Sequence, residues 1–304
     1  NLNTSKIYYN DTLGDFGHIG KGMLASFQAD YANKVPRSLL NNEPLRHLLN
    51  SVMDFKRIEN NILRGYLSAI SVTASSYSTG NSISFFQGTD NFKPWSRAKR
   101  SGEATQLNTE HLMASSSIPL VFPSIKIKSH HLGDGSVHQL SPLSPAIHLG
   151  AKNIFVIGVE QPKEPIYHNE NNPHPPSSAT IAGHLLDSIF SDTMSSDLER
   201  MIRINSTLKL IPKKKKESVE GLKHINSFII NPSNDFNSIA LKYYQDLPLP
   251  VRLLLRSAGI NKESESSIVS YLLFEKNFCT ELIKLGFEDA LEKETQIKNF
   301  LNLK

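Results

Sequence analysis

The sequence predicts an α/β protein in which helices pack on both faces of a mostly parallel sheet. Residues 153–159 form a continuous apolar run, which is typical of a strand buried on both faces of a parallel sheet. A helix is expected directly before it at residues 145–149, with Gly150 as its C-cap. Residues 66–74 alternate apolar and small polar side chains, as a half-buried strand does. Strand, helix and buried strand in succession indicate a layered α/β architecture.

The other elements are predicted from periodicity and from turn residues. A turn followed by a short helix is expected over 36–50, with Asn41 or Asn42 as its cap. Residues 77–81 predict a turn, and residues 82–87 a return strand. Further along the chain, the sequence predicts a helix over 108–117, a strand over 125–128, a tight turn at 133–136, a long amphipathic helix over 178–209, a strand over 224–231 and mainly helical structure over 236–304.

Composition indicates a soluble globular chain. The 304 residues are 39% hydrophobic and 20% charged, with a formal net charge of +4. So small an excess of basic residues does not favour nucleic acid as a partner. A single cysteine, Cys279, excludes an intrachain disulfide and favours a reducing compartment. No apolar run approaches the roughly 18–20 residues that a membrane span needs, and no secretory signal opens the chain.

Several catalytic and binding motifs are absent from the sequence. One cysteine and scattered histidines supply no zinc pattern, so no metal is expected. The glycine-rich stretch from Gly14 to Gly22 matches no phosphate-binding loop, and no organic cofactor is expected. No glycine is followed by another glycine four positions on, so the G-x-S-x-G nucleophile elbow does not occur.

Asp134, between Gly133 and Gly135 and followed by Ser136, is the leading candidate for chemistry. Such a triplet alone is most often a plain turn. Here it stands between an extended segment and a helix that leads to a buried strand, and ligands of open α/β sheets bind at strand ends. A carboxylate in that place could act as a general base. The serine run 115–117 is expected to be structural, because Pro119 ends its helix and no partner base is near in sequence.

Other side chains that could carry chemistry are expected to have structural roles. The histidines that flank Asp134 are interpreted as surface or supporting residues, and Cys279 as a buried thiol. Three aspartates of the long helix are expected to be solvated. Residues 91–104 are expected to form a solvated loop, with contact to anionic lipid as the alternative because basic residues flank Trp95. The histidines are His130, His131 and His138, and the aspartates are Asp187, Asp192 and Asp197.

Four segments, taken together, carry a family resemblance. They are Met113–Pro123 (MASSSIPLVFP), Gly133–Ser136 (GDGS), Pro142–Ala151 (PLSPAIHLGA) and Ile154–Val159 (IFVIGV). In order and spacing they resemble the distal half of the patatin-like phospholipase domain. Residues 70–86 are similar to the central strand and turn of that family, and the remainder is similar to the tail of bacterial members with a longer carboxy-terminal region.

The resemblance implies a three-layer α/β fold with helices on both faces and a Ser-Asp dyad. Asp134 matches the family aspartate by position, with Gly133, Gly135 and Ser136 as the motif around it. Ser136 stands where the family usually has Gly or Ala. The nucleophilic serine and the oxyanion loop lie in the part of the family domain that precedes these segments. Because Asn1 is not a methionine, we expect residue 1 to be an internal start and the serine to lie upstream of it.

The resulting expectation is a lipid acyl hydrolase fragment, inactive by itself, that contains the catalytic aspartate. Residues 1–160 are expected to form the distal part of the acyl hydrolase domain, 161–177 a linker or surface loop, and 178–304 a mainly helical extension. The expected partners are phospholipid or another lipid ester, with peripheral membrane contact. The expected location is the bacterial cytoplasm or a membrane periphery, with export as an effector left open. The alternative is a non-catalytic lipid- or protein-binding module of the same fold.

Overall fold

The computed structural model describes residues 3–9, 38–162, 178–212, 223–257 and 268–303, and only the helical backbone for residues 178–192. The chain forms two compact units. Unit 1 comprises Asn1–Gln139, Gln245–Asn261 and Leu272–Lys276; unit 2 comprises Leu140–Tyr244, Lys262–Tyr271 and Asn277–Lys304. The chain passes from unit 1 to unit 2 between Gln139 and Leu140, whereas the sequence predicts a domain boundary after residue 160. Most of the expected linker, residues 163–177, lies outside the described residues.

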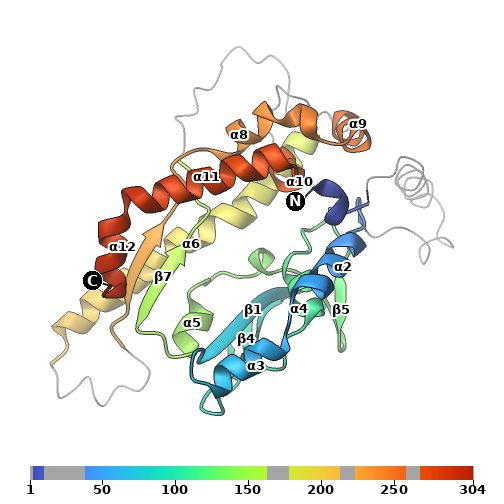
Figure 1. The fold of residues 1–304 in the computed structure, drawn as a ribbon. Helices are drawn as coiled ribbons and strands as arrows, with labels where there is room; N and C mark the ends of the chain where they lie inside the picture. Colours follow the sequence, from blue (N-terminus) through green and yellow to red (C-terminus); the bar gives the residue numbers. More distant parts are fainter. Residues whose placement is uncertain (1–2, 10–37, 163–177, 213–222, 258–267, 304) are drawn as a thin grey trace. The chain divides into compact units, whose positions relative to one another are not determined.

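Both units mix helices and strands, so the chain is a mixed α/β protein (Figure 1). The first elements of unit 1 are η1 (Thr4–Lys6), α2 (Glu43–Val52), α3 (Lys56–Leu63), β1 (Ala69–Ser76), β2 (Asn81–Gly88), β3 (Trp95–Arg97), β4 (Arg100–Ala104) and α4 (Thr109–Ser115). The next are β5 (Ile125–Ile127), β6 (His130–Asp134) and η3 (Gly135–Val137). The remaining elements of the chain are α5 (Ser144–His148), β7 (Asn153–Ile157), α6 (Ser178–Leu210), β8 (Asn226–Ile230), α8 (Phe236–Lys242), η4 (Tyr244–Asp246), α9 (Leu249–Ser257), α10 (Ile268–Leu272), α11 (Lys276–Glu292) and α12 (Glu294–Leu301).

The six-stranded sheet of unit 1 has the order β3-β4-β2-β1-β6-β5. The pair β2–β4 is parallel, and the other four pairs are antiparallel. The prediction of a mostly parallel sheet is therefore wrong for this unit. The physical reason is that β1–β2, β3–β4 and β5–β6 are each joined by two to four residues, a connection that permits only antiparallel pairing.

The core of unit 1 lies between one face of this sheet and α4. Met113 and Ala114 of α4 are fully buried against strand residues, among them Phe85 and Leu132. Apolar side chains of α2 and α3 extend this cluster. The N-cap of α4 is Asn108, whose side chain accepts a hydrogen bond from the N–H of Glu110 at 3.1 Å. This core holds the carboxyl end of β6 in place.

Residues 91–104, expected as a loop, contain the β3–β4 hairpin. Ala98 and Lys99 make its turn, and Lys99 has a positive φ of 56°. Trp95 stacks on Phe86 of β2 with ring centroids 5.1 Å apart. Its indole lies directly over Gly102, where a Cβ would collide with it. The segment is predicted as a loop because it is mostly basic and polar. Its one large apolar residue, Trp95, packs on β2, which the sequence of the segment does not show.

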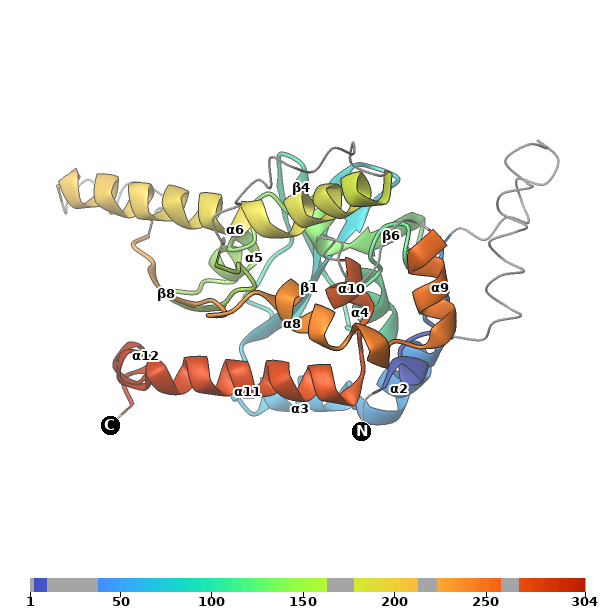
Figure 2. The ribbon, with the colours of Figure 1, turned by 90° about the horizontal axis from the view of Figure 1, so that it is seen from above.

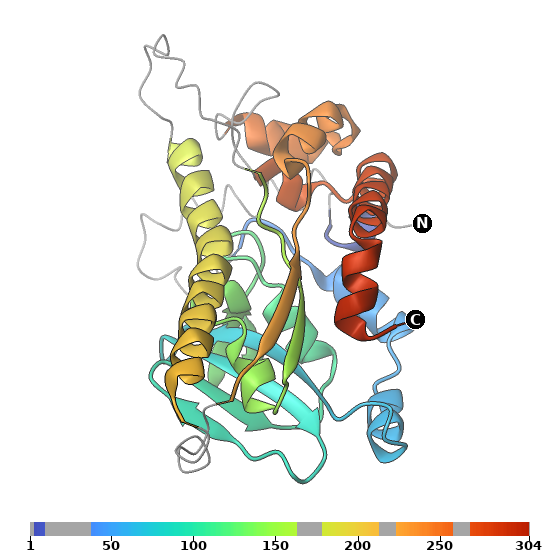
Figure 3. The ribbon, with the colours of Figure 1, turned by 90° about the vertical axis from the view of Figure 1, so that its left-hand side faces the viewer.

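In unit 2, β7 and β8 form a parallel pair with helices on both faces. Ile154 and Val156 of β7 are buried on one face with Met201 of α6. On the other face, Phe155 contacts Phe228 of β8 at 5.6 Å between ring centroids, and both rings contact Phe300 of α12. Figures 2 and 3 show α6 and α11 on opposite sides of the pair. The helices that cover this two-stranded sheet come from residues 178–304, which the sequence predicts to be a helical extension outside the sheet domain.

Most of the helices and strands predicted from the sequence occur in the structure. The predicted strands at 66–74, 82–87, 125–128, 153–159 and 224–231 correspond to β1, β2, β5, β7 and β8. The predicted helices at 108–117, 145–149 and 178–209 correspond to α4, α5 and α6, and Gly150 has the positive φ expected of a C-cap. The glycine-rich stretch 14–22 and the lysine run 213–216 lie outside the described residues. Among the described residues, no helix is long and apolar enough to cross a membrane.

Candidate functional site

Asp134 ends strand β6, and its backbone is held from two sides. It pairs with Ala74 of the neighbouring strand β1, and its N–H donates to the carbonyl of Ser117 at 2.9 Å. Ser117 lies just after α4, so this helix also fixes the position of the Asp134 turn. The predicted tight turn at 133–136 is therefore the end of β6 and the beginning of the 3₁₀ helix η3, with Asp134 as its N-cap.

One oxygen of the Asp134 carboxylate is bound by Ser136. Oδ1 accepts hydrogen bonds from the N–H of Ser136 at 3.0 Å and from its hydroxyl at 2.6 Å. Within the described residues no hydrogen bond reaches Oδ2. Burial raises the pKa of Asp134, and the two bonds from Ser136 oppose that rise. The result is a carboxylate that is oriented through Oδ1 and has a raised affinity for a proton.

A Cβ at either glycine beside Asp134 would meet a close neighbour. At Gly135 a Cβ would lie 2.5 Å from the carbonyl oxygen of Thr73, and at Gly133 it would collide with the ring of Tyr77. The hydroxyl of Ser75 donates to the carbonyl of Gly135 at 2.9 Å and accepts from the N–H of His138 at 3.0 Å. The turn is thus packed against β1 on both sides of the carboxylate, which limits its movement.

Tyr77 and Ser75 were not identified from the sequence. Burial raises the pKa of the Tyr77 phenol, and the charge of Asp134 raises it further, so the phenol keeps its proton near the carboxylate. The available signal was the pattern of β1, where small polar residues alternate with the apolar core residues. That pattern places Ser75 and Tyr77 on the same face, but it does not reveal that β6 lies beside them.

The three histidines near Asp134 contact the neighbouring strand in other ways. His130 lies with Nδ1 3.4 Å from the hydroxyl of Ser76. His131 donates its N–H to the hydroxyl of Ser78 at 3.2 Å. Nδ1 of His138 is buried, with no hydrogen-bond partner among the described residues. Within these residues no hydrogen bond joins any of the three imidazoles to Asp134, so a Ser-His-Asp arrangement gains no support.

The serine run has the structural role that the sequence predicts. Ser116 donates its hydroxyl to the carbonyl of Leu112 at 2.9 Å, and Ser117 donates to the carbonyl of Met113 at 2.7 Å. Ser117 is 1% exposed. Hydroxyls bound back to their own helix are not poised as nucleophiles.

Two other sequence interpretations need correction. Asp197, expected to be solvated, is buried and accepts a hydrogen bond from the N–H of Leu143 at 3.0 Å, at the start of α5. An unpaired N–H at a helix start needs such an acceptor, and the sequence of α6 alone does not show which carboxylate supplies it. Cys279 is half-buried and not buried. The side chains of Asp187 and Asp192 lie outside the described residues.

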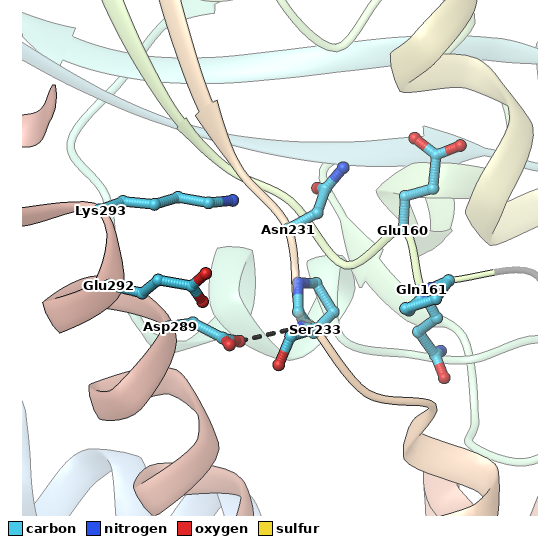
Figure 4. A pocket seen from close by; sticks show the side chains of 9 residues that line it. Glu160, Gln161, Asn231, Ser233, Asp289, Glu292 and Lys293 are labelled. Atoms are coloured by element: carbon cyan, nitrogen blue, oxygen red, sulfur yellow. Dashed lines mark hydrogen bonds between the residues drawn. The ribbon is translucent and has the colours of Figure 1, made fainter.

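Asp134 lines neither of two pockets that lie among the described residues. One pocket of about 490 Å³ lies in unit 2 beyond the carboxyl ends of β7 and β8 (Figure 4). Glu160, Asp289, Glu292 and Lys293 line it, and Asp289 accepts a hydrogen bond from the N–H of Ser233 at 3.1 Å. The other, of about 790 Å³, lies in unit 1 between α3 and the β2–β4 edge. No group of three potential metal ligands gathers among the described residues.

Comparison with known proteins identifies no relative. No family model, curated protein or solved structure matches the chain.

Proposed function

We propose that this chain carries the base half of the active site of a lipid acyl hydrolase of the patatin-like phospholipase type. Asp134 is the base, and the nucleophile is a serine upstream of Asn1. The observation that carries the proposal is the Asp134 carboxylate itself: Ser136 binds Oδ1, no hydrogen bond among the described residues reaches Oδ2, and burial raises the pKa. A general base works best when its pKa approaches the operating pH.

In the proposed reaction Asp134 moves one proton in each half of the cycle. The serine oxygen attacks the acyl carbonyl while its proton passes to Oδ2 of Asp134. Collapse of the tetrahedral intermediate breaks the ester bond, and the departing alcohol takes that proton. Water then attacks the acyl-serine ester, Asp134 accepts a proton from the water, and the serine oxygen recovers it as the fatty acid leaves. No metal or organic cofactor takes part in these steps.

The test compares the chain extended by its natural upstream residues with Asp134 variants of the same protein. We expect hydrolysis of p-nitrophenyl butyrate and of a fluorogenic phospholipid, and a loss of about 10²–10⁴-fold in kcat for Asp134→Asn. Asp90→Asn is the matched control, because Asp90 is an exposed carboxylate on a loop of the same unit. An Asp134→Asn protein that is folded and as active as the unsubstituted protein would refute the assignment.

The absence of G-x-S-x-G from the sequence favours a second candidate, a non-catalytic lipid- or protein-binding module. The two candidates differ in the residues encoded before Asn1. A G-x-S-x-G elbow there supports the hydrolase. Upstream residues that lack the elbow, together with no turnover of either ester, support the binding module.

A further inference from the structure

Positive charge concentrates at the end of the unit 1 sheet that carries the Asp134 turn. Three segments form this end: residues 75–82, 95–101 and 125–134. They contain five lysines and arginines and one carboxylate, that of Asp134. Their net charge of +4 equals that of the whole chain, although they comprise fewer than a tenth of its residues. Such a local excess creates a positive potential that attracts anions.

The strand register places these charges beside the candidate site. Gly133 pairs with Ser75, Ser75 with Ser82, Ser82 with Arg100, and Arg100 with Arg97. Neighbouring strands lie about 4.8 Å apart, so Arg100 and Arg97 are about 14 and 19 Å from Gly133 along the sheet. On the other side of the Tyr77 turn, Lys126 pairs with His131, whose carbonyl accepts the N–H of Tyr77 at 2.9 Å.

Arg97, Lys99 and Lys126, named here the basic rim, are exposed and available to a partner. No salt bridge among the described residues involves any of the three. Strand alternation puts Arg97 and Lys126 on the face away from the α4 core, because their neighbours Ser96 and Ile125 occupy core-facing positions. Lys128, by contrast, forms a salt bridge with Glu103, with 3.3 Å between Nζ and Oε2.

We propose that the basic rim docks the protein on an anionic lipid surface. Exposed cations attract the phosphates and carboxylates of anionic lipids. Tyr77 lies among them and is 46% exposed, and a tyrosine flanked by cations is suited to the interface between water and lipid. Trp95 does not insert, because it stacks on Phe86; the hairpin therefore binds through charge.

This proposal is independent of the Ser-Asp dyad, because vesicle binding needs no turnover. The probe is phosphatidylcholine vesicles with 30% phosphatidylserine at about 0.1 M salt, co-sedimented with residues 1–304. The triple variant Arg97→Gln, Lys99→Gln, Lys126→Gln should bind on the order of 100-fold more weakly, because each lost cation near an anionic surface weakens binding several-fold. Binding should also weaken as salt rises, and pure phosphatidylcholine vesicles should not be bound.

The matched control removes three cations from α3 and the residue that follows it: Lys56→Gln, Arg57→Gln, Arg64→Gln. These residues are exposed and precede β1, at the opposite end of that strand. The control should keep most of the vesicle binding, and the charge-conserving variant Arg97→Lys, Lys99→Arg, Lys126→Arg should keep all of it. Circular dichroism and the fluorescence of the single tryptophan, Trp95, report whether each variant is folded.

Three results would overturn the proposal. The first is an unsubstituted chain that does not bind the anionic vesicles. The second is a basic-rim variant that binds as the unsubstituted chain does, or no worse than the α3 control. The third is release of the chain from the vesicles when a nucleic acid duplex is added at equal phosphate concentration. That result would show that the basic rim binds nucleic acid in preference to lipid.

Discussion

At the scale of single residues, the Asp134 carboxylate is stabilised in its charged form by Ser136 and destabilised in that form by burial. Burial has the larger effect, so the pKa of Asp134 is raised. A general base in this state holds its proton more readily than a solvated aspartate does, and its orientation is fixed by the bond at 2.6 Å from the Ser136 hydroxyl.

Asp134→Asn is expected to raise the thermal stability of the chain at pH 7. Because the folded state binds the Asp134 proton more tightly than the unfolded state does, stability falls as pH rises from the ordinary aspartate pKa through the folded-state pKa. Above that pKa the full cost of the buried charge is present, and Asn removes it. The gain in Tm should vanish below about pH 4, where aspartate is protonated in both states. Calorimetry at pH 7 and pH 3.5 measures this, and an equal gain at both pH values contradicts it.

Ser136→Ala is expected to raise the pKa of Asp134 further. The change removes the hydroxyl bond to Oδ1, which lowers that pKa, and leaves the backbone bond. Titration of the ¹³C-labelled Asp134 carboxyl by NMR measures the shift without any need for turnover. Ser129→Ala, at an exposed position in the β5–β6 turn, is the control and should leave the titration unchanged. A midpoint that does not move in Ser136→Ala would show that the hydroxyl has no effect on the carboxylate.

Gly135→Ala is expected to destabilise the fold by about 1–3 kcal/mol. The added methyl would lie 2.5 Å from the Thr73 carbonyl oxygen, so β1 or the turn must move. Gly286→Ala on α11 is the matched control, because nothing lies within 4 Å of its added Cβ. In a helix that substitution should stabilise by about 0.5–1 kcal/mol. Urea unfolding of the two variants should therefore give changes of opposite sign.

At the scale of elements, side chains of α6 form hydrogen bonds with the residue before β8 and with the start of α5. Asn205 makes two hydrogen bonds with the backbone of Ile225: its Nδ2 donates to the carbonyl at 2.7 Å, and its Oδ1 accepts from the N–H at 3.1 Å. Ile225 directly precedes β8 and is buried. Asp197 on the same helix accepts from the start of α5. These bonds connect elements that are far apart in the sequence.

Asn205→Ala is expected to lower the free energy of unfolding by about 1–3 kcal/mol, because it leaves the buried N–H and C=O of Ile225 unpaired. Thr207→Ala, also on α6, is the control. Thr207 is exposed and donates only to the carbonyl of Arg203 on its own helix, so its loss should change stability by less than about 0.5 kcal/mol. Equal effects of the two substitutions in urea unfolding would show that Asn205 does not hold β8.

At the scale of the whole molecule, the proposal assigns the base to residues 1–304 and the nucleophile to a serine outside them. Residues 1–304 contain no nucleophile elbow. We therefore expect a fluorophosphonate probe to leave residues 1–304 unlabelled and to label the upstream-extended protein at one serine. Asp134→Asn in the extended protein should slow the labelling. Stoichiometric labelling of residues 1–304 would place the nucleophile within them and disprove the proposed dyad.

What the sequence by itself determined is local. The strand alternation of β1, the apolar run of β7, the Gly150 C-cap and the glycine turn around Asp134 are each set by side chains a few residues apart, so period and turn chemistry predict them. The sequence also identified the carboxylate that carries the proposed chemistry. It did not reveal that Ser136 binds that carboxylate, because the same spacing is common in turns with no such bond.

Only the tertiary structure decided which strands pair and what the turn contacts. It placed β6 against β1, so that Tyr77 lies over Gly133 and Ser75 binds the carbonyl of Gly135. It paired β7 with β8 in a second sheet, buried Asp197 at the start of α5, and folded residues 95–104 into a hairpin. The physical reason is that strand pairing and burial depend on which faces of distant segments fit together, and periodicity within one segment does not encode its partner.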